Sequence, residues 1–504
     1  MSAQIRKHSL ISSAVIYIGF AVGALNTYLF TKEGFFTEEQ YGLTQLFVTA
    51  AQLIVSFASL GMPSYIYKFY HYYNDHLEPR KNDMIAWALL TGLVCFALVF
   101  VLGIVFEDLF ARKFSNGSAL AVYYYYWMYP MSFGLTIFGI LEAYGWSLKK
   151  SILTNFLKEV QWRVLVTILI VLFIVKIVPD FDRFIKLYSF AYPVIALTLL
   201  IYLVATKKIH LTFKVSKVTR RFFRPIIRFI AFIYSGMLVF TISQQFDSLV
   251  LASVTETGLK NLGIFTLAQF LTSLIQAPQR SIIAASMPYI SKAWKDKKIS
   301  QIQNIYQRSS INQLIFACLM FTLIALNYTD AVVTFKLRES FLLGFVPFIL
   351  LGLTRVVDMG TGVNAQIIGT STYWKFDFIS GIILLLFMLP LTYIFTKRYG
   401  LIGPPIANLI SITIYNIIRI TFLWKKFRLF PFTRQSLYTV ILSVTVYLLA
   451  WLLFRNLHGF LGLFARSIFI VVLFTGSVYM LNLTPDLKPV LGSLVKRLKK
   501  NKER

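Results

Sequence analysis

The stretch MIAWALLTGLVCFALVFVLGIVF, residues 84–106, decides the fold class because it contains no charged side chain. An α-helix needs about 20 mostly apolar residues to cross the hydrocarbon core of a bilayer. Similar apolar stretches occur at residues 164–178, 378–395 and 438–454. Of the 504 residues 57% are hydrophobic and only 14% are charged, too few to cover the surface of a soluble protein of this length. The sequence therefore predicts an all-α polytopic membrane protein.

Apolar segments and short polar connectors together predict about fourteen membrane-spanning helices. The predicted spans are residues 9–31, 42–67, 84–106, 119–146, 152–178, 185–206, 225–252, 261–291, 305–328, 341–371, 375–396, 401–424, 436–455 and 462–483. The first span carries polar residues and no small-residue cleavage site, so we interpret it as a retained helix rather than a signal peptide.

The distribution of positive charge predicts the orientation of the chain. The sequence has 50 Lys and Arg against 21 Asp and Glu, a net charge of +29. Alternate short connectors carry about 30 and about 13 Lys and Arg, and the richer set is expected to face the cytoplasm. Both termini are then expected to be cytoplasmic. Basic loops of this kind indicate contact with anionic membrane lipids rather than with nucleic acid.

The two halves of the chain resemble each other weakly. Shifts of about 221 residues or slightly more pair Asn26 with Asp247, Gly42 with Gly263, Met62-Pro63 with Met287-Pro288, and Gly145 with Gly369. These pairs predict two parallel six-span lobes around a central cavity, followed by two further spans. The predicted parts are an N-terminal lobe (1–206), a basic cytoplasmic linker (207–224), a C-terminal lobe (225–430), two appended spans (431–485) and a basic amphipathic tail (486–504).

Ionisable residues in the tenth predicted span are the first candidates for a binding site. A charge at a helix centre costs roughly 2.5–3.5 kcal/mol on insertion scales, so it needs a reason to be there. Arg355 and Asp358 share one helix face, which continues through Gly362 to Gln366. One interpretation is a cavity-facing cation whose partner is exchanged for a substrate anion. The other is a structural ion pair that joins two helices.

The eighth predicted span carries a second polar stripe. Thr272, Gln276 and Arg280 follow one another at helical spacing, and Pro278 is expected to kink the helix beside them. Such a stripe either lines a water-filled lumen or joins helices through hydrogen bonds.

Other polar residues within the spans have two interpretations each. Asp247 and Glu142 are candidates for binding a coupling ion, although Asp247 also suits a loop cap and Glu142 lies near the loop lysines. Glu159 and Arg163 have the spacing of a structural helix pair. Arg419, close to a cytoplasmic helix end, is expected to extend towards the headgroups.

Several classes of chemistry have no motif in the sequence. We find no P-loop, no nucleophile elbow and no cluster of metal ligands, so neither a metal nor a cofactor is expected. The connectors are about 20 residues or shorter, which leaves no large external loop for a glycan polymerase or ligase. The sequence therefore predicts a transporter rather than an enzyme.

Four segments carry a resemblance to a known family. GVNAQIIGTSTYW (362–374), PLTYIF (390–395) and YGLIGPPIANLIS (399–411) resemble the end of the second lobe of polysaccharide-biosynthesis flippases, and QQFDSLVLA (244–252) resembles its start. These are the Wzx-type exporters of the multidrug/oligosaccharidyl-lipid/polysaccharide superfamily.

The resemblance implies a V-shaped pair of lobes with a cationic cavity. The implied cargo is an undecaprenyl-diphosphate-linked oligosaccharide, moved by alternating access to the periplasmic leaflet for O-antigen, capsule or exopolysaccharide synthesis. Arg280 and Arg355 are the candidate diphosphate contacts, and the implied partners are a glycan polymerase and glycosyltransferases. No dense arginine cluster occurs in the first two spans, so a lipid II-type phosphate site is not expected there. The alternative function is a cation-coupled multidrug exporter of the same superfamily.

Overall fold

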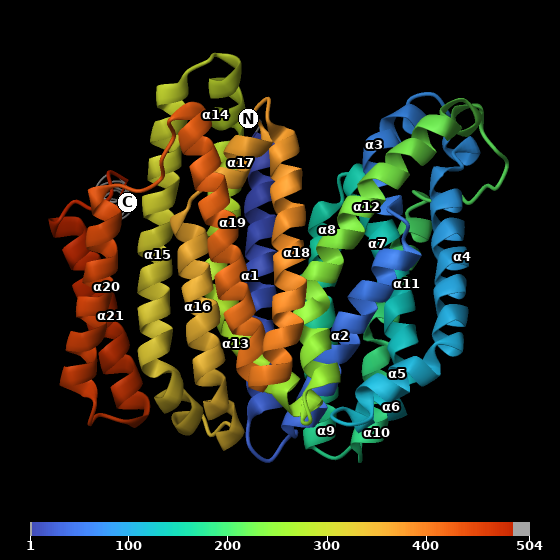
Figure 1. Cartoon of the computed structure of the whole chain (residues 1–504). Helices are drawn as coiled ribbons and strands as arrows, with labels where there is room; N and C mark the ends of the chain where they lie inside the picture. Colours follow the sequence, from blue (N-terminus) through green and yellow to red (C-terminus); the bar gives the residue numbers. More distant parts are fainter. Residues whose placement is uncertain (1–2, 487–504) are drawn as a thin grey trace, which may run out of the picture. The chain divides into compact units, whose positions relative to one another are not determined.

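The computed structural model describes residues 3–486, and within this range every regular element is a helix (Figure 1). Contacts between Cα atoms divide the chain into two compact units, unit 1 (Met1–Gly263) and unit 2 (Ile264–Arg504). The predicted amphipathic tail lies outside the described residues, apart from Asp486. The lobe boundaries drawn from the sequence stay a prediction.

Unit 1 is built around α7, which contacts α2, α3, α4 and α11 (Figure 1). Its helices are α1 (Ala3–Thr31), α2 (Glu38–Ala58), α3 (Met62–Asn74), α4 (Met84–Val105), α5 (Glu107–Phe114), α6 (Ala119–Tyr123), α7 (Met128–Ser147), α8 (Ser151–Asn155), α9 (Trp162–Ile174), α10 (Phe181–Ser189), α11 (Ala191–Ala205), α12 (Lys217–Val254) and the start of α13 (Gly258–Gln276). A π-helical segment, Phe156–Gln161, joins α8 to α9.

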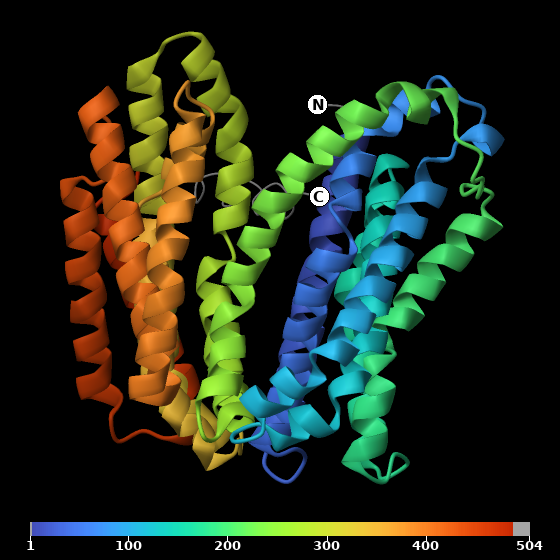
Figure 2. The same ribbon diagram turned by 45° about the vertical axis from the view of Figure 1, so that its right-hand side comes forward.

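Unit 2 packs around the long helix α15, which contacts α14, α16, α20 and α21. Figure 2 shows α15 (Ile299–Thr334) joined to α14 by the loop at the top of the view. The other helices of unit 2 are α14 (Gln279–Lys295), α16 (Phe345–Gly360), α17 (Asn364–Gly369), α18 (Trp374–Tyr399), α19 (Gly403–Phe427), α20 (Arg434–Phe454) and α21 (Gly459–Met480).

Polar side chains fix the starts of several helices. At α2, the Thr37 hydroxyl accepts the backbone N–H of Gln40 at 3.1 Å, and the Gln40 side chain accepts the backbone N–H of Thr37 at 2.9 Å. This reciprocal capping box satisfies two of the donors that a helix start leaves free. Asp180 and Ser216 cap α10 and α12 in the simpler one-sided way.

Nine helical stretches among the described residues are long and apolar enough to cross a membrane. One of them, Trp374–Phe427, extends over 54 residues and contains both α18 and α19. The all-helical membrane fold is therefore confirmed, whereas the number of fourteen spans stays a prediction.

Among the spans that we expected to be continuous, 119–146 and 185–206 are interrupted at single residues, Tyr124 and Phe190, and three more are broken over two or three residues. The first, residues 42–67, ends as α2 at Ala58 and resumes as α3 at Met62. Leu60 and Gly61 between them have φ of 42° and 69°. These left-handed conformations are incompatible with a continuing right-handed helix.

The other two breaks separate residues that we had placed on common helices. The span 261–291 is divided into α13 and α14 at Pro278, which lacks a backbone N–H and disfavours helix in the residue before it. The span 341–371 is divided into α16 and α17 at Gly362, where φ is +66°. A Cβ at Gly362 would also lie 2.8 Å from the Ser309 hydroxyl, so glycine is required there on two counts.

The glycines paired by the internal repeat lie in reciprocal contact. A Cβ at Gly42 would meet the carbonyl oxygen of Leu259, and one at Gly263 would meet the carbonyl oxygen of Glu38. One shift of about 221 residues relates both Gly42 to Gly263 and Glu38 to Leu259. The repeat therefore pairs residues that also contact one another within unit 1.

The repeat is less regular further along the chain. Met62 and Pro63 begin α3, whereas Met287 and Pro288 lie inside α14. The aligned pair therefore does not occupy equivalent helix positions.

Candidate functional site

Asp358, near the end of α16, is the centre of a polar cluster in unit 2. Its carboxylate accepts hydrogen bonds from Gln279 Nε2 on α14 and Asn416 Nδ2 on α19, both at 3.2 Å. Gln279 Oε1 in turn accepts from Gln276 Nε2 at 2.6 Å. The cluster thus joins the α13–α14 break to α16 and α19.

The break between α16 and α17 at Gly362 supplies the other side of this cluster. Asn416 Oδ1 accepts from Asn364 Nδ2 at 2.9 Å and from the Thr361 hydroxyl at 3.0 Å. Thr361 and Asn364 flank the left-handed Gly362. The interrupted helix therefore directs two polar side chains at Asn416 within a predicted membrane span, where unmade hydrogen bonds are costly.

The structure brings some of the predicted unit 2 residues together and separates others. Gln276 and Asp358 belong to one hydrogen-bonded cluster. Arg355 lies three residues before Asp358 on α16 and is half-buried, whereas Arg280 is exposed in the first turn of α14. Gln366 is half-buried on α17.

The prediction that each polar stripe lies on a single helix was wrong. Gln276 is the last residue of α13, whereas Arg280 is the second residue of α14, because Pro278 interrupts the helix between them. Gln366 follows the Gly362 break rather than continuing the face of Arg355 and Asp358. The binding roles of all five residues stay predictions.

Glu142, a candidate for ion coupling, is buried on α7 in unit 1. Its carboxylate oxygens lie 3.2 and 3.3 Å from Lys158 Nζ. Lys158 lies in the π-helical segment, a geometry often associated with functional sites. From the sequence, the loop lysines were the expected partners of Glu142, and nothing in it indicated Lys158.

The predicted pair of Glu159 and Arg163 is confirmed, with 2.5 Å between the Glu159 carboxylate and Arg163 Nη1. Glycines on α1 leave room for the arginine. A Cβ at Gly19 would lie 2.8 Å from Arg163 Nη1, and one at Gly23 would lie 3.1 Å from Arg163 Nε. Asn26 Nδ2 donates to the Arg163 carbonyl at 2.9 Å, so α1 is held against the π-helical segment and α9.

Asp247, the other ion-coupling candidate, is buried on α12 in unit 1. Nearby on α12, Gln245 Nε2 donates to Gln52 Oε1 of α2 at 2.6 Å. A loop-capping role for Asp247 is wrong, since the residue lies inside α12, seven residues before its end at Val254. Its role in ion coupling stays a prediction.

Arg419 does not extend to the headgroups as we expected. The side chain is buried on α19, pairs with Asp377 of α18 and donates to the Ser380 hydroxyl at 3.2 Å. Its guanidinium also lies 4.0 Å from the centre of the Tyr415 ring. The carboxylate, the hydroxyl and the ring face together replace the water that would otherwise solvate the guanidinium.

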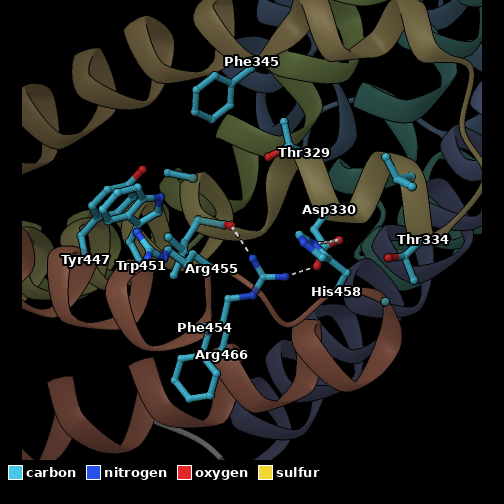
Figure 3. Close-up of a pocket in the computed structure, with 14 residues that line it drawn as sticks. Thr329, Asp330, Thr334, Phe345, Tyr447, Trp451, Phe454, Arg455, His458 and Arg466 are labelled. Carbon is cyan, nitrogen blue, oxygen red and sulfur yellow. Dashed lines mark hydrogen bonds and ion pairs between the residues drawn. The ribbon is translucent and has the colours of Figure 1, made fainter.

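Sequence reasoning missed a buried ion pair between α15 and α21. Arg466 Nη2 pairs with Asp330, and both side chains are 8% exposed. His458 Nδ1 lies 3.4 Å from the other oxygen of Asp330, and the three residues line a cavity (Figure 3). Each ionisable residue was visible in the sequence, but nothing local indicated the pairing.

Asp486, which follows the last candidate span, forms an ion pair that ties the end of the described chain to α15. Arg308 and Asn312 donate to Asp486, the Asn312 bond measuring 2.7 Å. Hydrogen bonding from Arg308 is the main cause that lowers the pKa of the Asp486 carboxyl. Across residues 3–486, no three His, Cys, Asp or Glu gather as a metal site.

Solved structures of membrane transporters share this fold. The lipid II flippase MurJ, in an inward-closed conformation, matches with a TM-score of 0.72 and 15% identity, over 94% of this chain and 99% of that one. An inward-facing multidrug resistance MATE family transporter of the MOP superfamily matches with 0.63 and 15%, over 83% and 97%. A point mutant of the Vibrio cholerae MATE transporter VcmN matches with 0.54 and 13%, over 85% and 98%.

The structural matches show the fold alone, since fewer than one residue in four is identical. No curated protein matches the sequence. A sequence model of a family described as "Polysaccharide biosynthesis protein" matches residues 5–294, which is more than half of the chain. The chain therefore belongs to the polysaccharide biosynthesis protein family and has the fold of the MOP superfamily of transporters and flippases.

Proposed function

We propose that the chain is a flippase for undecaprenyl-diphosphate-linked oligosaccharide. It moves this lipid from the cytoplasmic to the periplasmic leaflet of the bacterial inner membrane, with both of its own termini in the cytoplasm. The product serves O-antigen, capsule or exopolysaccharide synthesis, beside glycosyltransferases and a glycan polymerase. Family membership supports the substrate class, and the basic connectors support the orientation.

The observation that carries the proposal is the cluster around Asp358. Two amides, from Gln279 and Asn416, already donate to this carboxylate. The charge of Asp358 is therefore stabilised whether or not Arg355, on the same face of α16, binds an incoming anion. A guanidinium suits the diphosphate because its permanently charged, forked donors match phosphate oxygens.

In the proposed mechanism, the headgroup crosses by alternating access while the isoprenoid tail stays in lipid. Arg280 and Arg355 bind the diphosphate, and Gln276 and Gln366 offer side-chain amides to the sugar hydroxyls. A diphosphate cannot cross hydrocarbon without such partners, because an unpaired charge there is very costly. Glu142 and Asp247 are the proposed ion-coupling groups, since both are buried carboxylates within helices of unit 1.

The test is complementation of a flippase-deficient strain. We expect Arg280→Ala and Arg355→Ala to reduce glycan export at least about tenfold, since each removes a charge-assisted phosphate contact. Arg434→Ala is the matched control, because Arg434 is an exposed arginine at the start of α20. Full export by both variants, at equal protein levels, would remove these arginines from the mechanism.

The second candidate function is a cation-coupled multidrug exporter. The buried Glu142 carboxylate and the fold shared with MATE transporters favour it. Drug-resistance assays separate the two functions. Resistance that depends on Glu142, together with no restoration of glycan export, would favour the multidrug exporter over the flippase.

A further inference from the structure

Unit 2 contains a cavity of about 570 Å³ beside the two helices that follow α19. Its lining comes from the end of α15, the first turn of α16, the end of α20 and the start of α21. In Figure 3, Tyr447, Trp451 and Arg455 lie on one side, Asp330 and His458 on the other, and the Arg466 guanidinium between them. A cavity of this volume suits part of a small ligand.

The floor of the cavity is a neutral, hydrogen-bonded ion pair. Arg466 pairs with Asp330 and also donates to the carbonyl oxygens of Leu326 at 3.3 Å and Gly462 at 3.2 Å. Because these contacts join α15 to α21, the pair has a structural role. It adds no net charge to the cavity.

The rim of the cavity is positive. Arg455 and His458 are exposed at the turn between α20 and α21. Within residues 3–486, the Arg455 guanidinium makes no ion pair and no hydrogen bond. The cavity therefore carries at least one uncompensated positive charge.

A buried hydroxyl in the lining is also unsatisfied. Thr334 Oγ1, at the end of α15, is inaccessible to solvent and has no hydrogen-bond partner among the described residues. Buried polar atoms are rarely left without a partner, and such an exception needs an explanation. A ligand oxygen would provide that partner once rotation of the Thr334 side chain turns the hydroxyl towards the cavity.

The remaining lining is apolar and aromatic. Val333 and Phe345 provide hydrocarbon surface, and Trp451 and Tyr447 are the amphipathic residues typical of a membrane interface. The cavity lies at the end of α20 opposite Arg434, so it faces the periplasmic leaflet in the proposed orientation. A positive rim above apolar walls is complementary to an amphiphile with an anionic head.

We propose that this cavity binds the phosphate group of an anionic lipid from the periplasmic leaflet. Arg455 and His458 contact the phosphate, Thr334 completes its hydrogen bonds, and the hydrocarbon chain lies along Trp451 and Phe345. A bilayer phospholipid and a polyprenyl phosphate share this chemistry. The site is separate from the Asp358 cluster, because Phe345 and Asp358 lie at opposite ends of α16.

The test measures lipid binding to the purified full chain in detergent, by native mass spectrometry. The probes are phosphatidylglycerol, undecaprenyl phosphate and zwitterionic phosphatidylcholine. We expect at least one anionic probe to bind, with about tenfold weaker affinity in the Arg455→Gln/His458→Gln double variant and about threefold weaker affinity in Thr334→Val. Phosphatidylcholine should bind weakly in all cases.

Arg434→Gln is the control, since it removes one charge at the other end of α20. Sensitivity to the double variant with phosphatidylglycerol identifies a bilayer lipid as the source, and sensitivity only with undecaprenyl phosphate identifies the carrier lipid. Equal binding of both anionic probes by the double variant and the unaltered chain would overturn the proposal. The test does not measure glycan export. The lipid-binding proposal can therefore hold even if the proposed flippase function is wrong.

Discussion

In unit 1, Arg163 pairs with Glu159 four residues earlier, whereas in unit 2 Arg466 pairs with Asp330 across 136 positions of sequence. A second pair in each unit follows the same order: Lys158 and Glu142 are 16 positions apart in unit 1, and Arg419 and Asp377 are 42 apart in unit 2. The pair of Arg163 and Glu159 lies within one continuous helical run, whereas the other three pairs join separate helices. Loss of the buried Arg466 charge should therefore destabilise the fold more than loss of the Arg163 charge.

The largest effect is expected for Arg466→Met. Removal of the arginine leaves Asp330 buried without its cation, which should lower the free energy of unfolding by about 3–5 kcal/mol. Thermal unfolding in detergent measures this loss. The double variant Asp330→Asn/Arg466→Met should recover part of the stability, because the unpaired charge is gone. A loss below about 1 kcal/mol in the single variant would show that the pair does not hold α15 to α21.

A smaller loss of stability is expected for Arg163→Met in unit 1. The side chains of Arg163 and Glu159 are 22% and 26% exposed, so water partly replaces the lost partner. We expect a decrease of about 1.5–3 kcal/mol in the free energy of unfolding, the usual range for a hydrogen bond to a charged group. A loss of stability equal to that of Arg466→Met would remove the distinction between the two ion pairs.

This contrast also explains which contacts the sequence could predict. The pair of Glu159 and Arg163 follows from helical spacing alone, and it was found. The pair of Asp330 and Arg466 depends on how α21 packs against α15, which no local pattern specifies. The same holds for Lys158, because a π-helical turn changes which side chains face α7.

The sequence carries visible signals at the two helix breaks of unit 2. Pro278 by itself predicts a kink, and the spacing around Gly362 predicts a continuous helix face, whereas the structure has a break at each. Hydropathy detects an apolar segment but not whether its backbone is continuous. The breaks matter for function, since Asp358 receives its partners from residues beside them.

Asp358→Asn should reduce stability only slightly. The asparagine keeps one side-chain oxygen, which accepts from either Asn416 or Gln279, and places an NH2 group against the other amide donor. One hydrogen bond is lost together with the charge assistance, so about 1.5 kcal/mol is expected. Glycan export should fall further than stability does, because the anionic counterpart of Arg355 on the same face is lost. Measurement of export and unfolding on the same preparation checks this, and unchanged export would contradict the proposed site.

The smallest effect is expected for Asp486→Asn. Arg308 lowers the folded-state pKa of Asp486 below its usual value of 3.8, so the pair stabilises the fold above that pH. The contribution is lost as the pH falls through the lowered pKa. Since the two side chains are 51% and 29% exposed, about 0.5 kcal/mol is expected at pH 7. The difference in melting temperature between unaltered chain and variant should shrink at low pH, and a difference that grows would contradict the assignment.

The most direct measurement is lipid transfer in proteoliposomes that contain only this protein. A fluorescent undecaprenyl-diphosphate oligosaccharide is placed in both leaflets, and a membrane-impermeant reagent or lectin reports how much reaches the outer one. We predict protein-dependent transfer that Arg280→Ala and Arg355→Ala abolish and Arg434→Ala leaves intact. Transfer no faster than in protein-free liposomes, while a cationic drug is exported by the same preparation, would contradict the account.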